Sequence, residues 1–356
     1  MTKNSLKILL ISPLPPPAGG IASWTKQYIE WSNNHDLNID IVNTAVIGKR
    51  AEIINSKTKI SDELKRTKDI IRELKKKIIE VKPQIIHLNT PCGKLGIIRD
   101  YLCARIAKKH DVKLFIHYRC NISDQVRKSR ISRYFLKKIA NIADINLVLN
   151  TSSKEYLKSE ANSCSIKIAN FIDKTFILQG SKQISDKIKT ISFVGHIQRT
   201  KGIFEIIDVA RGFPEITFKL AGPIANEIKE IDKPSNLVFM GPLIKQEVRE
   251  LLIDSDIFLF PSYTEGFANA MLEAMSVGLP IISTPVGANI DMIESMGGVI
   301  VEVGDSLSII DAIEKMKNSN DRSKMSEWNL NKVKSEYTTE NGMSKLISLY
   351  LKEVDK

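Results

Sequence analysis

Short apolar runs recur along the whole chain, and stretches with helical spacing lie between them. The runs of the first half are KILLIS, NIDIV, QIIHL, KLFIHY, DINLVL and SIKIA, and those of the second half are ISFVG, ITFKLAG, LVFMG, IFLFPS, PIIST and VIVEV. Because the runs are uniformly apolar rather than alternating, they are typical of parallel strands covered on both faces. The alternation of strands and helices predicts βαβ units, and therefore an α/β chain with two doubly wound parallel sheets of about six strands each.

This rhythm breaks once, in the segment FIDKTFILQGSKQISDKIK that follows Asn170. The segment has a glycine, several polar residues and no clear period, so we place the join between two domains here. We predict an N-terminal domain over residues 1–172 and a second domain over 173–338, followed by a helix over 339–356. Each half of the 356 residues is long enough to bury its own core.

The apolar runs, the N-terminal segment and the cysteines help to predict the cellular compartment of the chain. No run approaches the ~20 apolar residues of a membrane span. The apolar run Leu6–Ser12 is too short for the core of a signal peptide, and a proline-rich stretch follows it. The four cysteines have no CxxC spacing, which predicts free thiols rather than a disulfide framework or a zinc site. We therefore expect a cytoplasmic chain.

The net charge of +11 is unevenly distributed. Residues 1–175 hold 32 Lys and Arg against 16 Asp and Glu, whereas residues 176–356 hold 20 against 25. This asymmetry predicts an anionic partner for the first half, such as an acidic membrane surface, a phosphate-bearing substrate or nucleic acid. Segments 61–82 and 126–138 concentrate the basic residues. Segment 61–82 is either a solvated surface helix or a face that rests on anionic lipid headgroups. Segment 126–138 adds a second basic cluster with aromatic neighbours.

Two glycine-containing turns follow predicted strands. Gly19 and Gly20 open the first helix, where a close backbone approach and a helix N-terminus suit a diphosphate, although a plain tight turn explains them equally well. In FVGHIQRTKG, Gly195 turns the chain, and Arg199 and Lys201 lie at the carboxyl edge of the second sheet, where open α/β sheets bind ligands. These two cations either neutralise a departing diphosphate or are solvated loop charges.

The segment PSYTEGFANAMLEAMSVGLPIISTPVG carries the strongest signal. Glu265 lies at the mouth of a predicted helix, and Glu273 lies about two turns into it. Carboxylates accept hydrogen bonds from sugar hydroxyls, and the N–H groups at a helix start bind phosphate or hydroxyl oxygens. We expect the N–H groups at this start to point into one space, namely those of Gly266, Phe267, Ala268 and Asn269.

Two other candidates have simpler interpretations. Asp254-Ser255-Asp256 is formally a DxD metal motif, but it lies between a predicted helix and a buried strand, where carboxylates cap the junction. His87 ends the run QIIHL and is either a site residue at the edge of the sheet or a satisfied strand-end histidine.

These segments resemble the retaining glycosyltransferases of family 4 (group 1), which have the GT-B fold. Glu265 and Glu273 match the E-x7-E motif of that family, and Gly195–Gly202 resembles its Gly-x-Leu-x3-Lys-Gly loop. Asn170 and Asp173 match its Asn-x-x-Asp pattern. The resemblance implies two Rossmann-like domains that face a central cleft, with the final helix packed back on the first domain. His196 departs from the family, which often has Arg at that position.

The resemblance also implies a role for each matching residue. Glu273 binds the ribose hydroxyls of a nucleotide, and Glu265 stabilises the positive charge that develops at the anomeric carbon. His117 faces the donor sugar, and Leu243, after Gly241-Pro242, lines the base pocket. The remaining donor-binding residues hold the sugar hydroxyls or the diphosphate; they are Gly19, Gly20, Gly195, Arg199, Lys201 and the backbone of Gly266, Phe267, Ala268 and Asn269.

The implied reaction transfers a sugar, with retention, from a UDP- or GDP-linked donor to an acceptor hydroxyl, without a metal or another cofactor. The expected acceptor is a lipid-diphosphate-linked glycan at an anionic membrane, in the synthesis of a surface polysaccharide. That places the chain on the inner face of the membrane as a peripheral protein. The alternatives are a nucleotide-sugar epimerase of the same architecture and a basic nucleic-acid- or membrane-binding protein without catalysis. The chain has no RNA-binding signature and few aromatic residues, so we expect no nucleic-acid partner.

Overall fold

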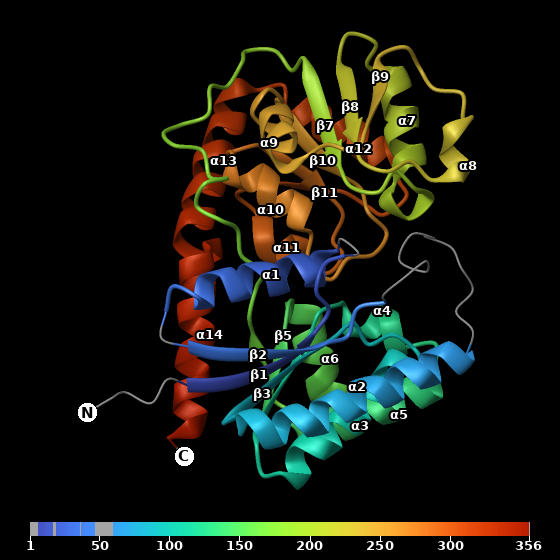
Figure 1. Ribbon diagram of the computed structural model, residues 1–356. Helices are drawn as coiled ribbons and strands as arrows, with labels where there is room; N and C mark the ends of the chain where they lie inside the picture. The colour runs from blue at the N-terminus through green and yellow to red at the C-terminus, as the bar shows by residue number, and fades with distance from the viewer. Residues whose placement is uncertain (1–5, 17–18, 36, 47–59, 356) are drawn as a thin grey trace. The chain divides into compact units, whose positions relative to one another are not determined.

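The computed structural model describes residues 6–16, 19–35, 37–46 and 60–355, and the chain divides into two compact units (Figure 1). Unit 1 comprises Met1–Asn170 together with Gly342–Lys356, and unit 2 comprises Phe171–Asn341. The division falls close to the break in the strand rhythm. Each unit is built around one parallel sheet with alternating helices, as the apolar runs predict.

Six parallel strands form the sheet of unit 1 in the order β2-β1-β3-β4-β5-β6. The strands are β1 (Leu6–Ser12), β2 (Leu37–Asn43), β3 (Ile85–Thr90), β4 (Lys113–Tyr118), β5 (Ile145–Val148) and β6 (Ile166–Lys167). The helices are α1 (Gly20–Ser32), α2 (Ile60–Val81), α3 (Gly96–Lys109), α4 (Ile122–Val126), α5 (Arg130–Ile142) and α6 (Thr151–Ala161).

The two faces of this sheet differ in chemistry. One face carries a mainly apolar core, in which Ile86 and Leu114 of the strands pack with Leu74 of α2, Ala104 of α3 and Ile139 of α5. Because side chains alternate along a strand, the residues between them point to the opposite face. That face lies beneath α1 and the last helix, α14 (Thr339–Val354), and it carries polar side chains (Figure 1).

Unit 2 repeats the architecture with the strand order β12-β11-β10-β7-β8-β9. Its strands are β7 (Thr190–Val194), β8 (Thr217–Ala221), β9 (Leu237–Gly241), β10 (Ile257–Phe260), β11 (Ile281–Ser283) and β12 (Gly298–Ile300). Its helices are the 3-10 turn η1 (Arg199–Lys201), α7 (Ile203–Gly212), α8 (Asn226–Lys229), α9 (Lys245–Ile253), α10 (Asn269–Ser276), α11 (Asn289–Ile293), α12 (Ser306–Lys315), α13 (Ser319–Lys332) and the π-helix η2 (Val333–Tyr337).

Three further expectations can be compared with the structure. The hydroxyl of Thr338 accepts a hydrogen bond from the N–H of Asn341 at 3.2 Å, so Thr338 caps α14. All four cysteines are free thiols, and only Cys164 is exposed. Within the part of the chain that the structure describes, no helix is both long and apolar enough to cross a membrane.

Candidate functional site

Two loops at the carboxyl edge of the unit 2 sheet are locked together. Gly202, between η1 and α7, has φ +75°, and a Cβ atom on it would lie 2.2 Å from the carbonyl oxygen of Pro261 after β10. The N–H of Tyr263 donates to the carbonyl of Thr200 at 3.0 Å. Only glycine permits both this conformation and this approach, so the sequence Lys-Gly holds the first loop against the second.

This contact brings Lys201 and Glu265 together. The ammonium of Lys201 donates a hydrogen bond to the carboxylate of Glu265, which also accepts one from the hydroxyl of Ser262 at 2.9 Å. The ammonium lies 5.6 Å from the centre of the Phe260 ring. The two charged side chains are 20% and 11% exposed, so the ion pair is largely shielded from water but open on one side.

The backbone of Glu265 is fixed from a third loop. Gly287, after β11, has φ +57°, and a Cβ atom there would lie 2.2 Å from the carbonyl oxygen of Glu265. The hydroxyl of Thr284 donates to the carbonyl of Ser262 at 2.5 Å. Three loops from neighbouring strands therefore determine where the carboxylate of Glu265 lies.

Helix α10 follows Glu265 as the sequence predicts. Asn269 is its first residue, and Ala268 is its N-cap without a side-chain hydrogen bond. Gly266 and Phe267 precede the helix, and the Phe267 ring packs edge-on against Tyr337 at 6.0 Å between ring centres. The N–H groups of Gly266 and Phe267 therefore belong to the loop that leads into the helix, and those of Ala268 and Asn269 belong to the helix start itself.

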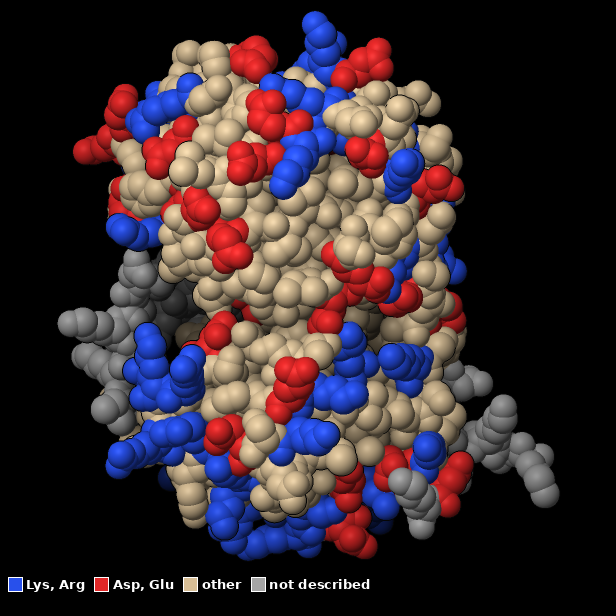
Figure 2. Space-filling view, turned by 180° about the vertical axis from the view of Figure 1, so that it is seen from behind, with Lys and Arg blue, Asp and Glu red and all other residues tan. Residues whose placement is uncertain are grey.

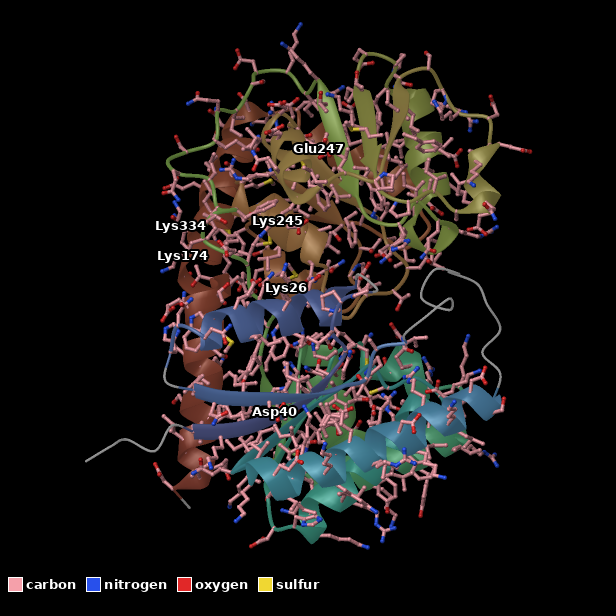
Figure 3. The ribbon with its side chains drawn as sticks, in the orientation of Figure 1. Lys26, Asp40, Lys174, Lys245, Glu247 and Lys334 are labelled. Carbon is pink, nitrogen blue, oxygen red and sulfur yellow. The ribbon has the colours of Figure 1, made fainter. Side chains whose placement is uncertain are left out.

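Glu273 lies on α10 in a desolvated position. Its side chain is half-buried, and none of the described residues hydrogen-bonds its carboxylate, although its main-chain carbonyl accepts from Ser276. Burial raises the pKa of Glu273 to about 7, and the opposing charge of Lys245 is too weak to reverse the effect. Lys245 is the first residue of α9 and is labelled in Figure 3. A carboxylate without a partner is a ready acceptor for hydroxyl groups.

The other predicted residues of unit 2 have contacts of their own. Arg199 is exposed, and its guanidinium stacks on Phe204 at 5.3 Å, whereas Lys201 of the same turn contacts Glu265. Gly195 packs under Gly222, where a Cβ atom would lie 1.9 Å from the Gly195 carbonyl oxygen. Half-buried Leu243 follows the turn at the end of β9.

Asp254 and Asp256 serve the junction between α9 and β10, as the sequence predicts. Asp254 is the C-cap residue of α9. The carboxylate of Asp256 accepts hydrogen bonds from the N–H groups of Lys189 and Thr190 at 2.8 and 2.9 Å. These bonds use the carboxylate to order the start of β7.

In unit 1, His117 is completely buried on β4. Its ring lies edge-on to Trp24 of α1, with 5.7 Å between ring centres. One guanidinium nitrogen of Arg119 lies 3.2 Å from Nε2 and 3.4 Å from Nδ1 of His117, so it rests against the face of the ring. Burial, and then the charge of Arg119, hold the pKa of His117 well below its usual value. The imidazole is therefore neutral at physiological pH.

His87 lies beside His117 and contacts the last helix. Its Nδ1 is hydrogen-bonded to the hydroxyl of Tyr350, which also receives a hydrogen bond from Tyr28 at 3.4 Å. Burial, and then Arg119, lower the pKa of His87 to about 3. His87 is thus a neutral histidine bound by Tyr350, whose position far along the chain the local sequence around His87 does not reveal.

Gly19 and Gly20 begin α1 and are exposed. Gly19 has extended backbone angles, and a Cβ atom on it would meet nothing within 4 Å. Packing in the described part of unit 1 therefore does not demand a glycine at this position. Of the predicted residues, Lys201 and Glu265 are in direct contact in unit 2, and His117 lies against Trp24 of α1 in unit 1.

Sequence reasoning missed several residues of these groups. Ser262 was quoted only as part of the motif, yet it hydrogen-bonds Glu265. Arg119 follows His117 by two positions, which places both on one face of the sheet and could have identified it. Tyr350 lies 263 residues after His87, and no local signal links the two.

Residues 175–332 match the model of the Glycosyl transferases group 1 family. The alpha-galactosylglucosyldiacylglycerol synthase of Streptococcus pneumoniae is 36% identical over 109 residues, 28% of this chain. The capsular polysaccharide biosynthesis glycosyltransferase CapM of Staphylococcus aureus is 33% identical over 141 residues, 36% of this chain. The UDP-Gal:alpha-D-GlcNAc-diphosphoundecaprenol alpha-1,3-galactosyltransferase of Escherichia coli is 26% identical over 146 residues, 39% of this chain. The alignments span between 29% and 37% of the length of these relatives.

Solved structures match the fold over nearly the whole chain. The sucrose-phosphate synthase from Thermosynechococcus elongatus has a TM-score of 0.80 at 15% identity and covers 98% of both chains. Anabaena Alr3699/HepE, solved in complex with UDP and glucose, has a TM-score of 0.69 at 13% identity and covers 97% of this chain and 99% of that one. The α/β architecture with two parallel six-stranded sheets is therefore the GT-B fold.

Proposed function

We propose that the chain, which carries a Glycosyl transferases group 1 domain over residues 175–332, transfers a sugar from a nucleoside-diphosphate sugar to an acceptor hydroxyl with retention of configuration. The donor is a UDP- or GDP-sugar, and the reaction needs no metal ion. The observation that carries this proposal is the ion pair of Lys201 and Glu265, held by three loops at the carboxyl edge of the unit 2 sheet.

The two residues of the ion pair can stabilise the two opposite charges of the proposed transition state. Sugar transfer develops positive charge at the anomeric carbon and negative charge on the departing diphosphate. A carboxylate stabilises the first, and an ammonium stabilises the second, most strongly where water is excluded. In the proposed reaction Lys201 turns to the diphosphate, and Glu265 is left to face the sugar. Neutral His117 of unit 1 offers a hydrogen bond to a sugar hydroxyl without adding charge.

Glu273 is the proposed ligand of the ribose. Its unpaired carboxylate accepts hydrogen bonds from two vicinal hydroxyls, which requires the ionised form. Because its pKa is about 7 in the free protein, donor affinity is expected to increase as the pH rises through 7. Ribose binding favours the ionised form and therefore lowers this pKa.

A thermal-shift panel tests the donor site. UDP, GDP, ADP and their sugars are added to the wild type, to Glu273→Ala and to the control Glu327→Ala on the exposed side of α13. A ligand at 100 times its Kd adds about 2.7 kcal/mol of stability. We expect one nucleotide family to raise the melting temperature of the wild type and of the control, but not of Glu273→Ala. Absence of any shift in the wild type would refute the proposal.

Retention and metal independence have their own measurements. Proton NMR of the product gives the anomeric configuration of the new bond, and an inverted product contradicts the proposed mechanism. Turnover with EDTA present is expected to equal turnover with added Mg²⁺. A loss of activity in EDTA that Mg²⁺ restores contradicts a metal-independent reaction.

The proposed acceptor is a lipid-diphosphate-linked glycan at an anionic membrane surface. Lys and Arg side chains crowd unit 1 on the face that Figure 2 shows. On α5, Ile131 is 62% exposed and Tyr134 is 56% exposed, and exposed Arg127, Lys128 and Arg130 lie beside them. Apolar side chains ringed by cations favour insertion among anionic headgroups. The name of the Escherichia coli relative, a transferase to a diphosphoundecaprenol-linked sugar, supports this acceptor class.

Vesicle flotation tests the membrane surface. The wild type is expected to float with anionic vesicles and not with neutral ones. The double variant Ile131→Ser/Tyr134→Ser should lose this binding, whereas Leu307→Ser, which removes a 72% exposed leucine from unit 2, should retain it. Equal behaviour of the two variants would contradict the assignment of the surface to α5.

A further inference from the structure

Arg119 is a buried cation without an acidic partner. The residue directly follows β4, and it is 7% exposed. Nη2 donates to the amide oxygen of Asn170 at 2.6 Å, Nη1 rests against His117, and the guanidinium carbon lies 4.5 Å from the centre of the Trp24 ring. Nε has no hydrogen-bond partner among the described residues. The charge is therefore held by two ring faces and one neutral amide.

Arg99, in the same unit, shows how a buried arginine is ordinarily accommodated. It is 4% exposed, and its guanidinium donates twice to the carboxylate of Asp100, at 2.9 and 2.7 Å. Burial opposes its charge, yet Asp100 raises its pKa above the usual value. Burial instead lowers the pKa of Arg119 to about 9, because no carboxylate counteracts the loss of solvent.

An isolated buried charge costs several kcal/mol of stability, because no opposite charge offsets its loss of solvent. The cation–π contact with Trp24 recovers only part of this cost. The position of Arg119 at the carboxyl edge of the sheet, under the first turns of α1, is where ligands reach open α/β sheets. A planar fork of N–H groups matches the oxygens of a carboxylate or a phosphate.

We infer that Arg119 is the cationic element of an anion site in unit 1, and that it binds an oxyanion of the substrate. The oxyanion is either a phosphate oxygen of a diphosphate or the carboxylate of an acidic sugar. His117 and Asn170 hold the guanidinium in place for it. This inference rests on the proposed function only for the molecule that carries the anion, because the site itself is built from residues of unit 1 alone.

The test compares Arg119→Gln with the matched control Arg99→Gln. Pyrophosphate and glucuronate are titrated separately into the intact chain, and the melting temperature and calorimetric Kd are measured. We expect one of the two anions to stabilise the wild type and Arg99→Gln. Its affinity for Arg119→Gln should be weaker by about 10- to 100-fold, as for other hydrogen bonds to charged groups. A response to pyrophosphate assigns the site to a diphosphate, and a response to glucuronate assigns it to an acidic sugar.

The free proteins give a second, independent measurement. Without ligand, Arg119→Gln should melt at or above the wild-type temperature, because an uncompensated charge is removed. Arg99→Gln should melt lower, because it leaves the carboxylate of Asp100 buried and unpaired. Arg119→Lys, which keeps the charge but loses the planar fork, should bind the anion with intermediate affinity.

Two results overturn the inference. One is that neither anion stabilises the wild type. The other is that Arg119→Gln binds the anion as the wild type does. Neither probe has a base or a ribose, so failure of the nucleotide panel above leaves these measurements unaffected, and the two proposals fail separately.

Discussion

Replacement of Glu273 by Gln is expected to stabilise unliganded unit 2 at alkaline pH while it removes nucleotide binding. The pKa of Glu273 is about 7 in the folded protein, against an ordinary value of 4.5, because burial disfavours the charged form. The fold therefore favours the protonated carboxyl. Its contribution to stability is fully present below pH 4.5 and is lost as the pH rises through 7. Glutamine keeps the shape and carries no charge at any pH.

The magnitude follows from these two pKa values. Their difference corresponds to about 3 kcal/mol once the pH is well above 7. Because the side chain is only half-buried, solvent screening reduces the expected gain to about 2 kcal/mol. For a domain of this size, that raises the melting temperature by about 4–8 °C. The gain should shrink toward zero as the pH is lowered to 4.5.

Scanning calorimetry at pH 5 and pH 8 measures this effect, with Glu327→Gln on the exposed side of α13 as the control. The control should melt with the wild type at both pH values. Addition of the nucleotide found by the panel should stabilise the wild type and the control, and should leave Glu273→Gln unchanged. If Glu273→Gln melts at or below the wild-type temperature at pH 8, the carboxylate is not desolvated and the reasoning fails.

Three other changes have defined outcomes. Gly202→Ala is expected to destabilise unit 2 by about 1–3 kcal/mol in urea denaturation, because the methyl group meets a carbonyl oxygen 2.2 Å away at a left-handed φ; wild-type stability would contradict the locked loops. Tyr350→Phe removes the hydrogen bond to Nδ1 of His87 and should cost about 1–3 kcal/mol in the same experiment, whereas an unchanged midpoint would show that the bond contributes nothing. Lys201→Gln should lower kcat by about 100-fold or more and should also lower the melting temperature, because it leaves the carboxylate of Glu265 without its cation. Lys201→Arg should recover part of the rate, and an equal loss of rate in both variants would argue against a role for the charge.

The sheets were predictable because parallel strands that are buried on both faces consist of continuous apolar runs in the sequence. Each run of the sequence contains or overlaps a strand of the structure. Helix α10 was also predictable from the sequence, although its N-cap residue, Ala268, has no capping side chain. The contacts of Gly202 and Gly287 were visible only as glycines in a motif. Their reason, a carbonyl 2.2 Å from a missing Cβ atom, depends on loops that meet only in the fold.

The polar row of unit 1 shows a different limit. His87, Asn89 and His117 interrupt apolar strands at alternate positions, so the sequence places them on shared faces, but the strand register alone sets Asn89 opposite His117. The cost of burying them is offset by the mainly apolar core on the other face of the same sheet. Arg119 also has no acidic partner among the described residues, and no sequence pattern predicts this. In unit 1 the apolar face of the sheet supplies stability, and the opposite face holds the unpaired cation. Substitution of Arg119 therefore tests the proposed anion binding without disturbing the apolar core.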